Sequence, residues 1–397
     1  MTEIEQRKEH RHKILMVHNY YQIPGGEDTV VANEKKLLED HGHEVVLYSR
    51  HNNELKNIGK LQKLALPFTT VFNPRTYRDI KRIIKEHNIE VVHVHNTLNL
   101  ISPSVYYAAV RMKASIVQTV HNFRFLCPGA TFYRDGHICE ECVSKGLNCA
   151  VKHKCYRNSR AQTLICVINT WIHRHTGILH KINYIALTEF NKKKLLQLKQ
   201  IDTERVFVKP NFTFAPQRRK KVSNEQDYYL FVGRIEEIKG VRLLIEAFRR
   251  MPKKALLLAG QGPLQQELTV SENITFLGQV DHNKVLEIMA GAKAVILPSQ
   301  IYEGFPMIVP EAFSLHIPVI VCNIGNNGVL IEDGKNGAKF EYNSVDSLIE
   351  TIKRFEKMDH KLLSENAYQD YISFYSDKSN YELLWEIYES VYTSERG

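Results

Sequence analysis

Short apolar runs of strand length alternate with helical periodicities along the first half of the chain. The runs at 13–19, 44–49, 90–95, 115–121 and 184–188 predict strands. They are continuous rather than alternating, which is typical of strands buried on both faces of a parallel sheet. Helical patterns such as 29–41 and 78–87 lie between them. This alternation predicts a parallel α/β sheet with crossover helices.

The same pattern restarts after a polar, charged segment at 216–227, which is expected to be a linker. Strands are predicted at 228–232, 255–259, 274–276, 294–298 and 318–322, and helices at 241–250, 282–291 and 306–316. The tail beyond 358 reads as helical. At 397 residues, the chain is long enough for more than one core.

We therefore expect an α/β fold of two Rossmann-like parallel-sheet domains that face each other across a cleft, a favoured place for ligands. The predicted boundaries are 1–215 for an N-terminal domain and 216–375 for a C-terminal domain. A terminal helix at 376–397 would cross back and pack towards the N-terminal domain.

The longest apolar candidates, 164–172 and 64–72, are interrupted by polar residues and are much shorter than the roughly 18–20 residues of a membrane-spanning helix. The first dozen residues are charged and lack the apolar core of a signal peptide. We expect a cytoplasmic protein, with peripheral attachment at the inner face of the plasma membrane as the alternative that the stretch 64–72 leaves open.

The net charge of +9 is unevenly distributed. Residues 1–215 carry 32 Lys and Arg against 19 Asp and Glu, whereas residues 216–397 carry 21 against 25. A basic first half suits contact with an anionic membrane surface or a phosphorylated lipid; a solvated basic face without a partner is the plainer alternative. No nucleic-acid motif accompanies the charge, so no nucleic-acid partner is expected.

Two glutamates eight residues apart, Glu303 and Glu311, frame the sequence EGFPMIVPE. The segment follows a predicted strand and leads into a helix, where free backbone N–H groups favour a phosphate. Carboxylates can also accept hydrogen bonds from paired sugar hydroxyls. On residue types alone, a capped helix with a solvated Glu303 and an ion-paired Glu311 explains the segment equally well.

A second segment reads VGRIEEIKG, from 232 to 240. Gly233 after a strand lets a ligand approach the backbone. Arg234 and Lys239 are two cations that can hold a diphosphate from two sides. Two ordinary surface cations are the alternative.

In the first half, His121 ends a predicted strand, where open α/β sheets place their ligands. A buried structural histidine is the alternative. Gly26 follows the first strand in a Gly-Gly turn before a helix and resembles a phosphate-binding turn, although it lacks the GxGxxG pattern.

In this combination and order, the chain resembles glycosyltransferase family 4, a group of retaining enzymes with the GT-B fold. The E-x7-E stretch is the specific part, and the turn at 260–263 and the segment FLGQV at 276–280 follow the family's order. The resemblance implies transfer of a sugar from a nucleotide-diphosphate sugar to a glycan or lipid-linked acceptor, in the synthesis of cell-surface polysaccharide or glycolipid. It implies that the domain at 1–215 binds the acceptor and the domain at 216–375 binds the donor, and that catalysis needs no cofactor.

The resemblance also implies roles for residues. Arg234 and Lys239 would hold the donor diphosphate, Glu311 the ribose, and Glu303 the donor sugar. His121 would reach that sugar, and Gly26 would approach the phosphates or the acceptor. Pro306 has no N–H, so the identity of the sugar stays open. Further donor contacts would come from Gly233, Gly304, Phe305, Met307 and Ile308, with Val280 and His282 beside the nucleobase.

Two other functions remain open at this point. A nucleotide-sugar epimerase on the same fold would act on the donor alone. A non-catalytic partner subunit would keep the fold but lose the site residues, which this chain has.

Five of the seven cysteines lie between 127 and 155. The C-x2-C spacing of Cys139 and Cys142 is typical of metal-binding knuckles. Some family 4 members of exopolysaccharide and cell-surface glycan pathways are similar here, and Cys127, Cys139, Cys142 and Cys155 are the matching positions. A structural zinc, reduced thiols and disulfides are the three readings.

Overall fold

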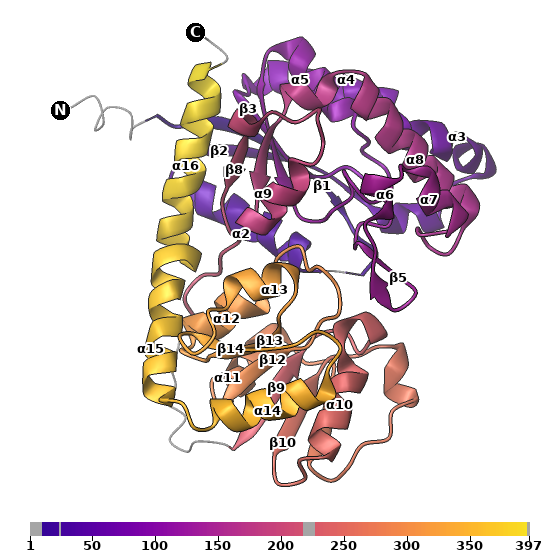
Figure 1. The fold of residues 1–397 in the computed structure, drawn as a ribbon. Helices are drawn as coiled ribbons and strands as arrows, with labels where there is room; N and C mark the ends of the chain where they lie inside the picture. The colour runs from indigo at the N-terminus through magenta and orange to yellow at the C-terminus, as the bar shows by residue number, and fades with distance from the viewer. Residues whose placement is uncertain (1–9, 24, 217–226, 395–397) are drawn as a thin grey trace, which may run out of the picture. The chain divides into compact units, whose positions relative to one another are not determined.

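The computed structural model describes residues 10–23, 25–216 and 227–394 (Figure 1). Most of the predicted linker, 217–226, therefore lies outside the described residues. The chain forms two compact units. Unit 1 comprises Met1–Ala130, Glu140–Lys209 and Tyr381–Gly397, and unit 2 comprises Thr131–Cys139 and Pro210–Asn380.

Unit 1 is built on a parallel six-stranded sheet in the order β2-β1-β3-β4-β7-β8. In register, Lys13 lies opposite Glu44 and Val91 opposite Ser115. Every residue of β3 and β4 is buried, as the continuous apolar runs predicted. The strands are β1 (Lys13–Tyr20), β2 (Glu44–His51), β3 (Val91–Asn96), β4 (Ser115–Val120), β7 (Asn183–Ala186) and β8 (Val206–Val208).

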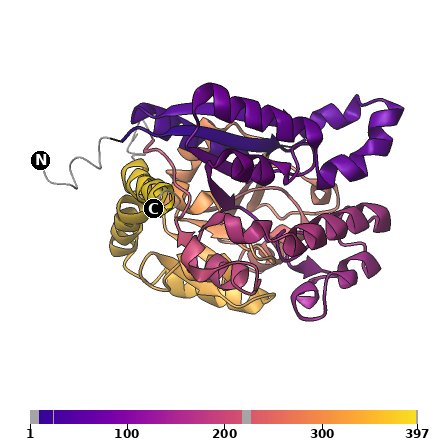
Figure 2. The same ribbon diagram turned by 90° about the horizontal axis from the view of Figure 1, so that it is seen from above.

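Helices cover both faces of this sheet (Figures 1 and 2). Their ends follow local chemistry: α4 starts at Pro74, after Asn73 accepts a hydrogen bond from the Arg75 amide, and stops at Asn88, which adopts a left-handed conformation. The α-helices are α2 (Gly26–Asp40), α3 (Lys60–Val71), α4 (Pro74–His87), α5 (Ser104–Met112), α6 (Glu141–Ser144), α7 (Asn148–Lys152), α8 (Arg160–His175) and α9 (Glu189–Leu195). Single 3-10 turns are η1 (Asn52–Lys56), η2 (Ile178–Lys181) and η3 (Thr203–Arg205).

Unit 2 holds a second parallel six-stranded sheet in the order β11-β10-β9-β12-β13-β14. Its strands are β9 (Tyr228–Val232), β10 (Ala255–Ala259), β11 (Ile274–Gly278), β12 (Ala294–Leu297), β13 (Val319–Cys322) and β14 (Gly337–Phe340). Its helices are η4 (Glu237–Lys239), α10 (Val241–Arg249), η5 (Pro263–Gln266), α11 (His282–Met289), α12 (Ile308–Ser314), α13 (Gly325–Leu330), α14 (Val345–Phe355), α15 (His360–Asp370) and η6 (Tyr371–Tyr375). The two sheets confirm the predicted fold class.

A short hairpin within the cysteine-rich region belongs to unit 2, although the residues on either side of it belong to unit 1. It pairs β5 (Tyr133–Arg134) with β6 (His137–Ile138). Phe132 packs edge-on against Tyr302, with ring centroids 6.1 Å apart, and the Tyr342 hydroxyl donates to the Gly136 carbonyl at 3.5 Å. These contacts join the hairpin to the second sheet's loops.

The last helix, α16 (Asp377–Ser394), begins in unit 2 and belongs to unit 1 from Tyr381 onward. Figure 2 views this helix nearly along its axis. Its side chains enter the same core as β1, β3, β4 and β7 through Leu384, Ile387, Tyr388 and Val391. Among the described residues, no helix combines the length and the apolarity needed to cross a bilayer.

Candidate active site

The loops that follow β9 and β10 in unit 2 pack backbone against backbone. The Gly233 amide donates to the Ala259 carbonyl at 3.0 Å, and the Gly260 amide donates to the Gly278 carbonyl at 2.8 Å. A Cβ at Gly260 would lie only 1.8 Å from the Gly233 carbonyl oxygen. The glycine is therefore required for close packing, and it keeps the carboxyl end of the sheet free of side chains beside Gly233.

Lys239 and Glu303 form an ion pair next to this edge. The Lys239 Nζ lies 2.6 Å from Oε1 of Glu303, and the Ser299 hydroxyl donates to the same oxygen at 2.5 Å. Burial is the largest influence on Glu303 and raises its pKa, but the charge of Lys239 and these hydrogen bonds outweigh it, so the net pKa is lowered. Glu303 is thus an ionised group at neutral pH.

The turn that carries Glu303 is held by Asn326. Its side-chain N–H groups donate to the carbonyls of Glu303 and Gly304, both at 2.6 Å. Beyond the turn, Met307 caps α12, and Ile308 is the first helical residue. The amides at the start of a helix have no intrahelical acceptor, so these two point a pair of donors away from the helix.

Glu311 lies in the first turn of α12 and is only 8% exposed. Burial raises its pKa to about 7. Within the described part of the chain, its carboxyl group has no ion-pair or hydrogen-bond partner. Burial without a partner disfavours the charged form of the carboxyl, which explains the raised pKa.

Arg234 approaches the same place from the loop after β9. Its guanidinium forms an ion pair with Glu236 at 3.0 Å, its side chain is about half exposed, and its charge also lowers the Glu303 pKa. The predicted residues Arg234, Lys239 and Glu303 are therefore neighbours, although they come from segments more than sixty residues apart. Val280 and His282 lie beyond β11, where Asp281 caps α11 and His282 is exposed.

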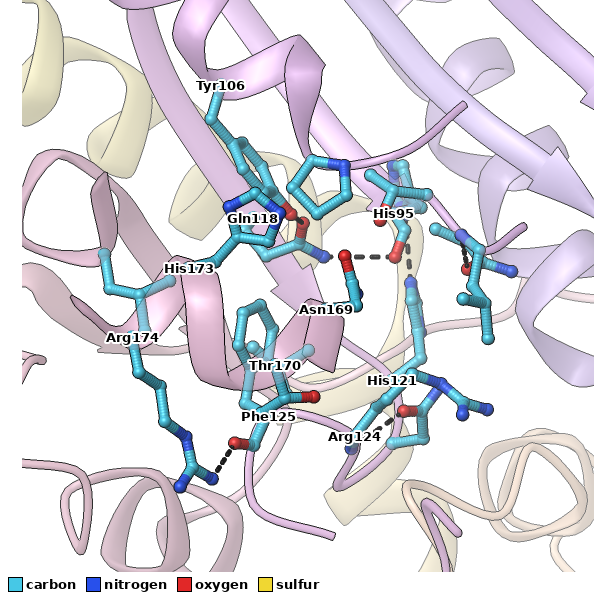
Figure 3. A pocket seen from close by; sticks show the side chains of 17 residues that line it. His95, Tyr106, Gln118, His121, Arg124, Phe125, Asn169, Thr170, His173 and Arg174 are labelled. Atoms are coloured by element: carbon cyan, nitrogen blue, oxygen red, sulfur yellow. Dashed lines mark hydrogen bonds between the residues drawn. The ribbon is translucent and has the colours of Figure 1, made fainter. Parts of the chain in front are cut away.

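In unit 1, His121 follows β4 and lines a cavity of about 90 Å³. Figure 3 shows the His121 ring directed at His95, and the two facing nitrogens are 3.0 Å apart. Tyr106 from α5 and Gln118 from β4 also line the cavity, and the Tyr106 hydroxyl donates to the Gln118 amide oxygen at 2.5 Å. Asn169, His173 and Arg174 contribute from α8.

The histidines of unit 1 surround a buried ion pair. Lys209 Nζ lies 2.7 Å from Oε1 of Glu34, and neither side chain is exposed. Burial, followed by the positive charges of nearby histidines and Lys209, places the pKa of His121 well below its usual value. His121 is therefore neutral at pH 7. Its ring can donate one hydrogen bond and accept another.

Both units match models of known protein families. Residues 24–213 match the family model described as Glycosyltransferase Family 4, and residues 214–370 match Glycosyl transferases group 1. The chain belongs to the family 4 glycosyltransferases.

Individual relatives of this glycosyltransferase differ in their acceptors. The phosphatidylinositol N-acetylglucosaminyltransferase gpi3 subunit of Schizosaccharomyces pombe is 22% identical over 94% of this chain and 79% of its own length. The D-inositol 3-phosphate glycosyltransferase of Mycolicibacterium smegmatis is 27% identical over 42% of this chain and 44% of its own length.

Solved structures share the fold. A glycosyltransferase from Rickettsia africae has a TM-score of 0.68 at 18% identity, over 96% of this chain and 98% of that one. The Anabaena protein HepE in complex with UDP has a TM-score of 0.66 at 16% identity, over 95% of this chain and all of that one. At this level of identity the likeness concerns the GT-B fold only.

Sequence reasoning missed one titratable residue beside a predicted site residue of this glycosyltransferase. Gly26 opens α2, and the next residue, Glu27, is buried so that its pKa rises to about 8. The Tyr21 hydroxyl donates to it at 3.0 Å. Its position directly after Gly26 was the available signal, but its burial is a tertiary property that the sequence does not display.

The cysteine-rich region only partly resembles a closed metal site. Cys127, Cys142 and Cys155 gather in unit 1, since Cys142 has its pKa raised to about 12 by burial and then by these neighbouring thiols. Cys139 belongs to unit 2. Among the described residues, the groups of three possible ligand atoms within 4.8 Å of one another contain no cysteine. Zinc bound by Cys127, Cys139, Cys142 and Cys155 therefore stays a prediction, which metal analysis of the purified chain can test.

Proposed function

We propose that this glycosyltransferase moves a glycosyl group from a nucleotide-diphosphate sugar to a glycan or lipid-linked acceptor, with retention at the anomeric carbon and without a catalytic metal. Support comes from unit 2, where two cations and an ionised Glu303 follow strands of one sheet, and a buried Glu311 carboxyl lies in the first turn of α12. This set matches the charges and hydroxyls of a nucleotide sugar.

In this proposal the diphosphate binds Arg234 and Lys239, which supply the positive charge that a divalent ion would otherwise provide. Glu311 accepts hydrogen bonds from the two ribose hydroxyls. The loop with Val280 and His282 borders the nucleobase. The amides of Met307 and Ile308 donate to the phosphate or the sugar.

The bond from the anomeric carbon to the diphosphate oxygen breaks as the bond to the acceptor oxygen forms on the same face. The departing phosphate oxygen takes the acceptor's proton. Catalysis then rests on positioning and on neutralising the leaving group. His121, which is neutral, offers the donor sugar a hydrogen bond without competing for the diphosphate.

A screen of nucleoside diphosphates and nucleotide sugars by thermal shift tests the donor site, because a ligand stabilises the state it binds. We expect one nucleotide series to raise the melting temperature of the wild-type chain. Lys239→Ala should abolish that shift and lower kcat/KM by about 100-fold or more, the loss typical of removing one stabilising charge. Arg242→Ala is the matched control, since Arg242 is an exposed cation paired with Glu237 and Glu267.

Equal nucleotide shifts in the wild type and Lys239→Ala would contradict the diphosphate role. Incubation with the donor alone separates transfer from epimerisation, because an epimerase needs no acceptor. Analysis of the product's anomeric configuration tests retention.

We further propose that unit 1 docks on an anionic membrane surface through α3 and α8, which pack beside each other. Leu64 and Phe68 on α3 are 72% and 77% exposed, and Trp171 on α8 is 55% exposed. Neither helix contains an acidic residue, whereas Lys60, Lys63 and Arg160 add positive charge. Exposed apolar groups beside basic ones favour the interface of an anionic bilayer.

A further inference from the structure

Three side chains of unit 1 converge away from the cavity and the glycine loops. His10 Nε2 lies 3.2 Å from Oε2 of Glu90, and His12 Nδ1 lies 3.3 Å from the same oxygen. The three ligand atoms all fall within 4.8 Å of one another. We call these residues the His10–His12–Glu90 cluster.

We propose that the His10–His12–Glu90 cluster is a binding site for a divalent zinc ion, with two imidazole nitrogens and one carboxylate oxygen as protein ligands. Zinc bonds to such atoms are about 2.0–2.1 Å long, so tetrahedral ligands lie about 3.4 Å apart. The nitrogen-to-oxygen distances of 3.2 and 3.3 Å match that spacing. His10 is 35% exposed, so an ion can reach the cluster from solvent.

The groups that contact the three ligand side chains are arranged as in known metal sites. Zinc-bound histidines usually present the other ring nitrogen to a carboxylate, and bound carboxylates are themselves hydrogen-bonded. Here His12 Nε2 lies 2.9 Å from Oε1 of Glu389, on α16. The Tyr392 hydroxyl, also on α16, donates to Oε1 of Glu90 at 3.1 Å. The Lys13 amide donates to Oε2 at 3.3 Å and leaves that oxygen a further lone pair.

His12 has too few protons to satisfy the two carboxylates that face it, which favours a cation at this place. A neutral imidazole has one N–H, yet both ring nitrogens of His12 face a carboxylate. His12 Nε2 and Glu389 Oε1, both buried, make no hydrogen bond of good geometry. If zinc binds Nδ1, that nitrogen needs no proton. The single N–H of His12 can then lie on Nε2 and donate to Glu389.

A second cluster of possible ligands, formed by Glu34, His93 and His95, does not call for a metal. Lys209 already places a positive charge 2.7 Å from Oε1 of Glu34. The Tyr388 and Thr119 hydroxyls lie 2.7 Å from the two ring nitrogens of His93. A divalent ion there would meet the lysine charge at close range, so the His10–His12–Glu90 cluster is the better zinc site.

The proposed ion would connect three parts of unit 1 that are far apart in the sequence. It joins the segment before β1, the segment before β3 and, through Glu389 and Tyr392, the last helix. Its expected effect is to stabilise the docking of α16 rather than to take part in glycosyl transfer.

The test uses the full chain without an affinity tag, stripped with a chelator and then titrated with zinc or cobalt. His10→Ala removes an accessible ligand with little expected loss of packing, and Glu90→Gln removes the charge. His87→Ala is the matched control, because His87 also faces a single carboxylate, Glu44, at 3.5 Å. We expect zinc affinity to fall at least tenfold in both cluster variants and to stay unchanged in His87→Ala, since even outer contacts to a zinc ligand are worth 10–100-fold.

Cobalt distinguishes this site from the cysteines, because only thiolate ligands give sulfur-to-metal charge-transfer bands. The proposal expects visible cobalt absorption without those bands, lost in His10→Ala and kept in His87→Ala, and a zinc-dependent rise in melting temperature that follows the same pattern. Zinc uptake and melting temperature that are the same in His10→Ala and the wild type would overturn it. So would cobalt bound with thiolate bands alone.

Discussion

At the scale of single residues, the two glutamates of the E-x7-E segment have opposite electrostatic environments. Glu303 is paired with Lys239 at 2.6 Å, and its pKa is lowered. Burial is the only influence on the Glu311 carboxyl, and it raises the pKa to about 7. The same residue type thus supplies a permanent anion at one position and, at the other, a carboxyl that titrates near neutrality.

The raised pKa of Glu311 predicts a pH-dependent stability. The stability that the protonated Glu311 carboxyl contributes is fully present below the ordinary glutamate pKa. It is lost as the pH rises through the folded-state pKa of about 7. A shift of this size corresponds to up to about 3 kcal/mol. We expect Glu311→Gln to raise the melting temperature of the ligand-free chain at pH 8 and to leave it almost unchanged at pH 4.

The same variant should lose the nucleotide-induced thermal shift, because a neutral amide accepts ribose hydrogen bonds more weakly than a carboxylate. Glu332→Gln, at an exposed position of the same unit where the carboxylate pairs with Lys335, is a control that removes one carboxylate without touching α12. A variant that is less stable than the wild type at pH 8 would refute the unpaired state of Glu311.

Residue identities indicated which residues could form the proposed donor site, but they did not indicate the environment of each residue. Glycines after strands and charged residues at strand ends were visible in the sequence, and the structure brings Arg234, Lys239 and Glu303 together. The pKa of Glu27 and the support of the turn by Asn326 could not be predicted, since both depend on burial and on contacts between distant segments.

At the scale of elements, the loops after β9 and β10 are fitted to each other. Gly260→Ala would push a methyl group into the Gly233 carbonyl, which lies 1.8 Å from the added carbon. We expect a loss of about 3 kcal/mol or more in the free energy of unfolding, together with loss of nucleotide binding. Chemical denaturation followed by tyrosine fluorescence or circular dichroism measures the first effect.

Gly334→Ala is the control for backbone strain alone. Gly334 has a φ of +80°, yet a Cβ there would meet nothing within 4 Å. This substitution should cost about 1–2 kcal/mol, the ordinary penalty of a left-handed conformation. Equal losses at the two positions would show that the backbone contact between Gly233 and Gly260 is unimportant.

Membrane docking through α3 and α8 predicts that Leu64→Glu combined with Phe68→Glu abolishes binding to anionic liposomes. The melting temperature should stay the same, because both side chains are exposed. Binding by the wild type should weaken with salt. Leu362→Glu, which alters a 55% exposed leucine of unit 2, is the control and should bind normally. Liposome cosedimentation measures each case.

The elements that sequence patterns predicted best are the long apolar strands. The runs at 13–19 and 115–121 correspond closely to β1 and β4. The three-residue β8 and the strand β14, which contains a lysine, carry too little apolar pattern to stand out. The apolar run at 64–72 illustrates the opposite difficulty, because α3 exposes much of it and periodicity alone does not say which face is covered.

At the scale of the whole molecule, unit 1 depends on the end of the chain for its core. Leu384 is fully buried in the cluster that includes Ile14 and Val91. Leu384→Ala should lower the free energy of unfolding of unit 1 by about 2–5 kcal/mol. Ile372→Ala, at a 45% exposed position of unit 2, should change little.

If the two units unfold separately, calorimetry should show Leu384→Ala moving one transition only. The nucleotide-dependent stabilisation of the other transition should persist, because the residues proposed to bind the diphosphate and the ribose, Arg234, Lys239 and Glu311, belong to unit 2. A single transition that moves as a whole would instead mean that the units unfold together.

The hairpin of β5 and β6 has a consequence for exchanging parts between related enzymes. Because Thr131–Cys139 belongs to unit 2 while the residues around it belong to unit 1, neither unit is one contiguous gene segment. A chimera joined only near Lys209 would pair the host's Tyr302 and Tyr342 with a foreign hairpin. Successful recombination of acceptor and donor specificities should therefore transfer these nine residues, and the final helix, along with the unit to which each belongs.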